Sequence, residues 1–207
     1  MPLVRADRAA DPSAEGHGDS GDPHALLEEL YAAEASRRRA AARNLAMYPH
    51  AAPALCARLV VEPAASVRSV IFTALIGLRS DAAVQGLLPC LRSEDVALRN
   101  AAIEALGHMP DVLEPYIRSL LEDDDSDVRI FAVNVLGALA HAQAPRWLEA
   151  VLRCDPHVNV CAAAVEGLAE LGDQESRSAL VDLPGRFPDE PFIAFATKAA
   201  LARIGTV

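Results

Sequence analysis

The sequence predicts an all-α fold built from about six stacked helical pairs, and three observations support this prediction. First, a block that begins with an apolar residue and Arg recurs at Val67-Arg68, Leu98-Arg99 and Val128-Arg129. Second, each copy leads to a late Leu, and these Leu residues are separated by 31, 30, 32 and 33 residues, a period typical of helical repeats. Third, the chain is rich in Ala and Leu and only 4% aromatic, which agrees with an all-helical domain. The marker residues are Leu75, Leu106, Leu136, Leu168 and Leu201.

Each repeat is predicted to contain a first helix, a short polar loop and a second helix. In the repeat that begins at Asp81, apolar residues recur at helical spacing up to Leu91, a polar loop follows at 93–95, and a second apolar series ends at Leu106. We expect a solenoid over residues 23–207, in which neighbouring pairs share one core, preceded by a disordered N-terminal tail over 1–22. The same pattern along the chain predicts pairs at 23–49, 50–80, 81–109, 110–142, 143–173 and 174–207.

Local signals mark the starts of several helices. Asp22-Pro23 and Asp155-Pro156 each place a helix-capping side chain before a Pro that suits the first helical position. Glu190-Pro191 is a weaker version of the same signal. The five marker Leu residues are expected to form the spine of the core.

Composition favours a cytoplasmic protein with reduced cysteines. The four cysteines form no C-x-x-C pair, so we expect packed thiols and no disulfide framework. No apolar run reaches the roughly 20 residues that span a bilayer. Residues 1–22 lack the apolar core of a secretory signal, and we therefore expect no membrane association.

The repeated blocks resemble HEAT repeats, most closely the short bacterial type of phycobilisome-lyase-like proteins. The best matches join each apolar-Arg pair described above to Ala74-Leu75, Ala105-Leu106-Gly107 and Leu136-Gly137. This resemblance implies an armadillo-like, right-handed α-α superhelix. In the fifth and sixth repeats Cys161 and Ala194 stand where the family has Arg, so stacking is expected to be less regular there.

In HEAT proteins the second helix of each pair usually lines the concave face. The resemblance therefore exposes the residues two and six places after the apolar residue of each block. We expect this face to hold a protein partner, as a peptide or helix, with an apolar contact near Ile130; the alternative is a solvated face whose variation has no function. The candidate partner-binding residues are Arg39, Arg43, Ser69, Thr73, Asn100, Glu104, Ile130, Asn134 and Glu166.

Charge is distributed unevenly along the chain. The net charge is −10, but residues 81–190 alone carry 20 acidic and 8 basic residues, a net charge of −12. Such a field favours a basic partner surface and repels phosphate backbones. Arg37-Arg38-Arg39 with Arg43 is the opposite case and leaves nucleic acid as an alternative. Phosphate binding needs a broad basic footprint, which the otherwise acidic chain lacks, so we expect no nucleic-acid binding.

Two further clusters have a simple structural interpretation. The acidic run at 122–127 is predicted to be a solvated loop that caps a helix. Cys154, Asp155, His157 and Cys161 fall within eight residues and contain zinc-ligand types. Their spacing matches no standard finger and Asp155 is also a natural cap, so we predict no metal site and keep zinc as the alternative.

The predicted function is a non-catalytic scaffold or adaptor, without a cofactor and present as a monomer or weak dimer. The sequence contains no phosphate-binding loop, no G-x-S-x-G and no H-E-x-x-H motif. The resemblance leaves one alternative, a bilin-lyase-like subunit that acts on a tetrapyrrole-bearing client, with Cys161 or His108 as the residues to test. Phe187, Phe192 and Phe195 are expected to cap the last repeat rather than form a contact surface.

Overall fold

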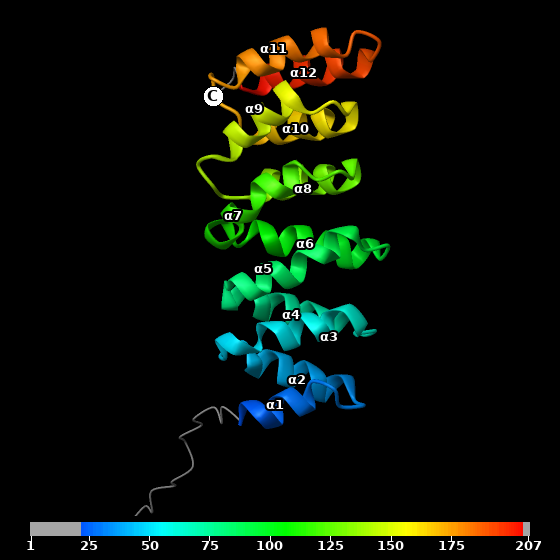
Figure 1. Cartoon of the computed structure of the whole chain (residues 1–207), viewed down its shortest axis with the longest axis vertical. Coiled ribbons are helices and arrows are strands. Elements are labelled where there is room, and N and C mark those ends of the chain that lie inside the picture. Colours follow the sequence, from blue (N-terminus) through cyan, green and yellow to red (C-terminus); the bar gives the residue numbers. More distant parts are fainter. Residues whose placement is uncertain (1–21, 205–207) are drawn as a thin grey trace, which may run out of the picture.

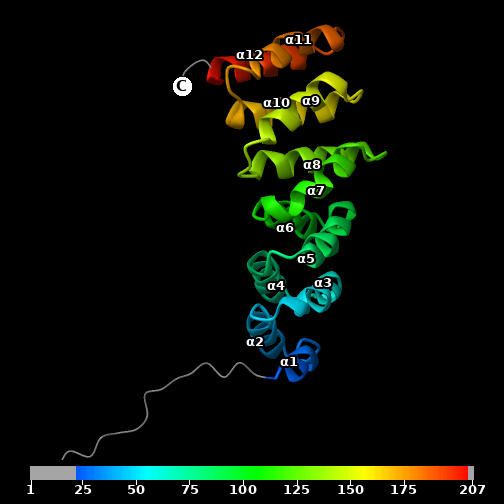
Figure 2. The same ribbon diagram turned by 60° about the vertical axis from the view of Figure 1, so that its left-hand side comes forward.

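The computed structural model describes residues 22–204, and this part of the chain is a right-handed stack of six helical pairs without strands. Figures 1 and 2 show the pairs following one another along a single long axis. The predicted all-α solenoid is therefore confirmed. The predicted tail lies outside the described residues, apart from Asp22.

The helix bounds follow the predicted repeats closely. The first helices are α1 (Pro23–Glu29), α3 (Ala52–Val61), α5 (Asp81–Leu87), α7 (Pro110–Leu121), α9 (Ala144–Cys154) and α11 (Arg177–Arg186). The second helices are α2 (Ala35–Leu45), α4 (Ala65–Leu78), α6 (Val96–Gly107), α8 (Ser126–Ala138), α10 (Val158–Leu171) and α12 (Pro191–Ile204). Two short 3-10 helices, η1 (Pro49–Ala51) and η2 (Leu88–Arg92), precede α3 and follow α5. Pro89, which has no backbone N–H to donate, lies where α5 gives way to η2.

The core runs through all six pairs, and four of the five marker residues lie in it. Leu75, Leu106, Leu136 and Leu168 are at most 1% exposed. Leu201 is only half-buried, so its place in the predicted spine is wrong. It lies on α12, which has a helical pair on one side only within the described residues.

The two rows of helices pack differently. Every second helix packs against the next second helix, from α2 through α12. Among the first helices, α3 packs against α5, α5 against α7 and α9 against α11, but α1 and α3 stand apart, as do α7 and α9. The row of first helices is therefore interrupted at two places in the described chain.

One of the two predicted Asp-Pro caps is confirmed and the other is wrong. Asp22 caps α1 by accepting a hydrogen bond from the His24 N–H at 3.1 Å, with Pro23 as the first helical residue. The helix predicted to begin at Pro156 begins instead at Val158. The reason is that the Asp155 carboxylate accepts from the Arg129 Nε at 2.7 Å and from the His157 N–H at 2.8 Å, and so forms a turn before the helix.

A ladder of arginines ties the first, second and fourth repeats each to the repeat that follows. In the third repeat Arg99 instead donates to the Ser93 carbonyl of its own loop and lies over the Phe131 ring of the next repeat. Arg38 pairs with Glu62, Arg68 with Asp95 and Arg129 with Asp155, in each case reaching the loop of the following repeat. Asp95 caps α6 rather than pairing with the Arg four residues later. These cross-repeat bonds fix how one helical pair is placed on its neighbour.

The fifth repeat keeps this ladder without an Arg at the usual position. Cys161 occupies that position, and Arg186 of α11 reaches into the same place, where it donates hydrogen bonds to the carbonyls of Leu152 and Asp155. The packing of α10 against α12 is as extensive as that of earlier pairs, so the expected irregularity at the carboxyl end is not found. A side chain distant in sequence replaces the missing guanidinium.

Candidate functional site

The nine predicted partner-binding residues lie on five consecutive second helices. Eight of them are exposed and Ile130 is half-buried. Positions two and six after a buried residue lie about 200° and 240° around an α-helix, which places them opposite the core. We call the surface they share on α2, α4, α6, α8 and α10 the second-helix face.

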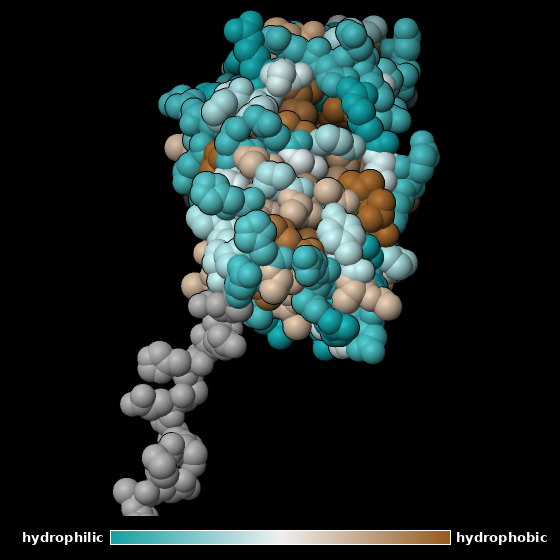
Figure 3. All heavy atoms as spheres, turned by 60° about the horizontal axis from the view of Figure 1, so that its bottom comes forward, coloured by the Kyte–Doolittle hydropathy of each residue, from teal (hydrophilic) through white to brown (hydrophobic). Residues whose placement is uncertain are grey.

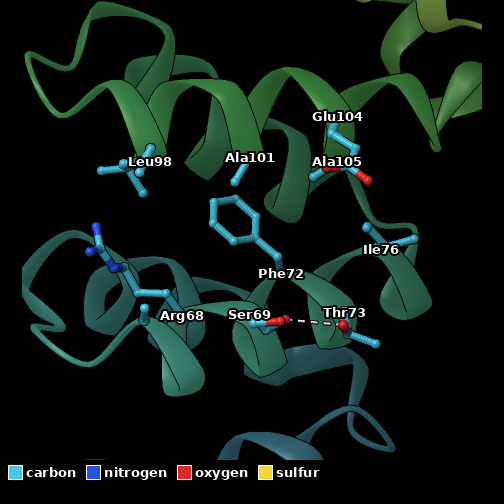
Figure 4. Close-up of a pocket in the computed structure, with 11 residues that line it drawn as sticks. Arg68, Ser69, Phe72, Thr73, Ile76, Leu98, Ala101, Glu104 and Ala105 are labelled. Carbon is cyan, nitrogen blue, oxygen red and sulfur yellow. Dashed lines mark hydrogen bonds between the residues drawn. The ribbon is translucent and has the colours of Figure 1, made fainter.

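A groove opens on this face between α4 and α6, and we call it the α4–α6 groove. Its volume is about 290 Å³. Figure 4 shows Phe72 of α4 beneath Ala101 of α6, with Ile76 farther along α4 on the side of Ala105 and Glu104. Arg68 lies at the other end of the groove. The groove therefore has an apolar floor between one acidic and one basic side chain.

Three predicted residues, Ser69, Thr73 and Glu104, meet in the α4–α6 groove. The Thr73 hydroxyl donates to the Ser69 carbonyl at 3.0 Å, which holds that side chain against its own helix (Figure 4). Phe72 was missed as a groove residue, because its register places it in the core and it is only 8% exposed. The sequence offered one sign of a groove here: Phe72 is large, whereas Ala97 and Ala101 of the next repeat have small side chains that leave it uncovered.

Ile130, the apolar contact predicted from the sequence, is half-buried and packs against the core. A second apolar part of the face lies two second helices earlier, at Phe72 and Ile76.

The basic cluster at the start of the solenoid is divided among three environments. Arg37 forms an exposed ion pair with Glu29. Arg38 is buried, and donates to both Glu62 oxygens at 2.8 Å and to the Ala33 carbonyl at 2.7 Å. Arg39 and Arg43 remain exposed on the second-helix face.

Charge on the second-helix face changes along the stack. Arg39 and Arg43 supply positive charge on α2, whereas Glu104 on α6 and Glu166 on α10 supply negative charge. All four side chains are exposed. A bound partner would therefore meet a basic end and an acidic middle.

The side chains of the candidate zinc cluster are separated. Cys154 is exposed, while Cys161 is buried and donates to the Asp155 carbonyl at 3.5 Å. The Asp155 carboxylate is ion-paired with Arg129, and Arg186 Nη1 lies 3.8 Å from the Cys161 Sγ. Among residues 22–204, no group of three or more His, Cys, Asp or Glu side chains is placed to hold a metal ion.

Three of the four cysteines, all except Cys154, are buried. Burial raises the pKa of the Cys161 thiol to about 11, and burial together with Cys90 raises the pKa of Cys56 to about 11. Cys161, one of the two residues suggested by the lyase alternative, is therefore out of reach of a client, whereas His108 is exposed at the end of α6.

The terminal Phe residues have different roles. Phe187 packs against the core, with the Arg186 guanidinium 5.2 Å from its ring centre. Phe192 is 42% exposed and Phe195 is 76% exposed, so the capping prediction is wrong for these two. They project from α12, which has a neighbouring pair on one side only in the described chain.

Exposed apolar side chains also occur at the other end of the stack. Toward the N-terminal end, Figure 3 shows separate hydrophobic patches among hydrophilic side chains. Tyr31, Met47, Val60 and Val61 are more than half exposed in this region.

None of the helices within residues 22–204 is long and apolar enough to cross a bilayer.

Comparison with known proteins supports the repeat assignment. Residues 84–158 match the family model of HEAT repeats, which confirms the resemblance over the central part of the chain. No curated protein matches the chain.

Several solved structures are similar to this one. An engineered protein is 18% identical with a TM-score of 0.42, covering 90% of this chain and 97% of its own. A designed armadillo repeat protein is 15% identical with a TM-score of 0.41, covering 88% and 99%. The complex of CpcE and CpcF of phycocyanin lyase from Nostoc sp. PCC7120 is 20% identical with a TM-score of 0.36, covering 99% of each chain.

Proposed function

We propose that this chain is a non-catalytic scaffold that binds a protein partner along its second-helix face. The observation that carries the proposal is the α4–α6 groove, where an apolar floor at Phe72 and Ile76 lies beside exposed polar side chains. Interfaces of this kind combine a buried apolar centre with a polar rim. Glu104 and Glu166 add negative charge, so a partner with basic residues facing α6 and α10 fits best.

Charge reversal at these two carboxylates tests the proposal. The double variant Glu104→Lys/Glu166→Lys is expected to weaken partner binding about tenfold or more and to reduce its salt dependence, because two attractive contacts become repulsive. The measurement is quantitative capture from a host lysate on the immobilised chain, followed by titration of the captured partner at two salt concentrations.

A matched control separates a local effect from a change in net charge. Glu28→Lys/Asp182→Lys makes the same charge change at exposed positions on α1 and α11, in the row of first helices. It should leave binding by the captured partner unchanged. Equal weakening by both double variants, or no weakening by either, would rule out the second-helix face.

The lyase-like alternative makes a different prediction. A scaffold without tetrapyrrole chemistry should leave the absorption spectrum of an added bilin unchanged. A shifted spectrum that is lost in His108→Ala would favour the alternative, since His108 is exposed and Cys161 is buried.

A further inference from the structure

A second and larger cavity lies in the row of first helices, where α7 and α9 stand apart. This α7–α9 cleft has a volume of about 820 Å³ and is open to solvent at residues outside the second-helix face. The helices α7 and α9 are not packed against each other, so the cleft stays open between them.

The floor of the α7–α9 cleft is apolar. Ile117 and Leu121 of α7 face Trp147 and Val151 of α9, and Ala150 lines the same wall with a small side chain. Ile117 and Val151 are buried, whereas Leu121 and Trp147 are half-buried and thus still partly accessible. An apolar ligand surface would gain burial here without displacing a packed side chain.

The rim of the cleft is acidic. Five carboxylates and two guanidinium groups line it, a net charge of −3. Asp155 is occupied by Arg129, and Glu122 is paired with Arg118. The Asp124 carboxylate is exposed and makes no ion pair with another residue of the described chain. It can therefore pair with a Lys or Arg side chain of a bound partner.

One end of the cleft is braced by an aromatic pair. The His141 ring stacks on Trp147 with ring centres 4.8 Å apart. His141 Nδ1 accepts from the Gln143 N–H at 3.1 Å, which leaves Nε2 directed to Glu114 at 3.7 Å. The loop before α9 thus connects α7 to α9 and holds Trp147 in place beside the opening.

We infer that the α7–α9 cleft binds a basic amphipathic helix of a partner protein, with its apolar side against Trp147 and Leu121 and its Lys or Arg residues toward Asp124 and Glu114. Charge complementarity selects this occupant, because an acidic or phosphate-bearing ligand would be repelled by the rim. Insertion of an amphipathic helix into an apolar groove is a recurrent mode of peptide recognition. The inference is independent of the partner proposed for the second-helix face.

The test uses the full chain and a synthetic Leu/Lys peptide of about 18 residues with helical amphipathic spacing. Trp147 is the single Trp of the sequence, so its fluorescence reports directly on the cleft. We expect saturable binding with a shift of the emission to shorter wavelength, and weaker binding as salt is raised. A peptide with Glu in place of Lys should not bind.

Two variants locate the binding site. Ala150→Arg fills the cleft and adds a positive charge, and Asp124→Lys reverses the free carboxylate; each should weaken peptide binding about tenfold or more. Both positions are exposed, so folding should be retained and is checked by circular dichroism. Glu28→Lys makes the same charge change as Asp124→Lys at an exposed position on α1, outside both proposed binding surfaces, and should leave peptide binding unchanged.

Several outcomes would overturn the inference. They are an absent fluorescence shift, equal binding of the Leu/Glu peptide, and equal weakening by Glu28→Lys and Asp124→Lys. A dimer in sedimentation that Ala150→Arg dissociates would assign the cleft to a second copy of the chain instead. Failure of the lysate experiment with Glu104→Lys/Glu166→Lys would concern the other face alone.

Discussion

Replacing Glu62 by Ala is expected to lower the free energy of unfolding by about 3–5 kcal/mol, the range for removing one partner of a buried ion pair. The Glu62 side chain is fully buried and its two oxygens hold together three elements. They accept hydrogen bonds from Arg38 of α2 at 2.8 Å, from Arg58 of α3 at 2.8 Å and from the Ala64 N–H before α4 at 2.9 Å. Without the carboxylate, the buried Arg38 guanidinium loses its counter-charge. Chemical denaturation followed by far-UV circular dichroism measures the effect.

The Glu29–Arg37 pair supplies the control. It is also an ion pair between a Glu and an Arg of α2, but both side chains are exposed. Surface pairs contribute little to stability, so Glu29→Ala should leave the unfolding transition almost where it is. Similar losses in both variants would contradict the structural role of Glu62.

Acidification gives a second measurement of the same pair. The hydrogen bond from Arg38 lowers the pKa of Glu62 from its ordinary value of 4.5 to about 2. Between these values the unfolded chain binds more protons than the folded chain, so stability falls as the pH falls from about 4.5 toward 2. Glu62→Ala should lack this part of the acid loss. An unchanged pH profile in the variant would contradict the lowered pKa.

Replacing Leu106 by Ala is expected to cost about 2–5 kcal/mol, the range for truncating a fully buried Leu. Leu106 is 0% exposed and lies on α6, whose neighbours α4 and α8 share the same core. Truncation leaves a cavity at the junction of three repeats, and stability in a solenoid depends on such interfaces between neighbours. The loss is a large part of the roughly 5–15 kcal/mol that holds a typical domain folded.

Leu201 provides a matched comparison at the same position of the sixth repeat. It is half-buried on α12, so Leu201→Ala should destabilise the chain less than Leu106→Ala. Thermal unfolding of the two variants side by side measures the difference. An unchanged melting temperature for Leu106→Ala, or a larger loss for Leu201→Ala, would mean that the repeat register is misassigned.

The repeat register was predictable because it depends on periodicity within each helix. The spacing of Leu75, Leu106 and Leu136 reports which side of each second helix meets the core, and all three are buried. The exposure of Arg39 and Glu104 follows from the same helical period. Nothing outside the repeat itself is needed for these assignments.

Contacts between repeats were not predictable in this way. Asp95 caps α6 and binds Arg68 of the preceding repeat, 27 residues away, which no period within a single helix reveals. Arg186 could not be connected with Cys161 from sequence, since the two lie 25 residues apart and meet only because α11 packs against α9 of the preceding repeat. Asp155 was predicted to cap a helix, but in the structure its carboxylate is ion-paired with Arg129 of the preceding repeat.

The sequence by itself determined the all-α class, the six helical pairs and the side of each second helix that faces solvent, because these follow from local periodicity. Only the tertiary structure decided where neighbouring helices separate, and therefore where the α4–α6 groove and the α7–α9 cleft open. The width of such an opening depends on how whole helices tilt and pack against one another. That packing is a sum over side chains from several repeats at once, so no single segment of the sequence encodes it.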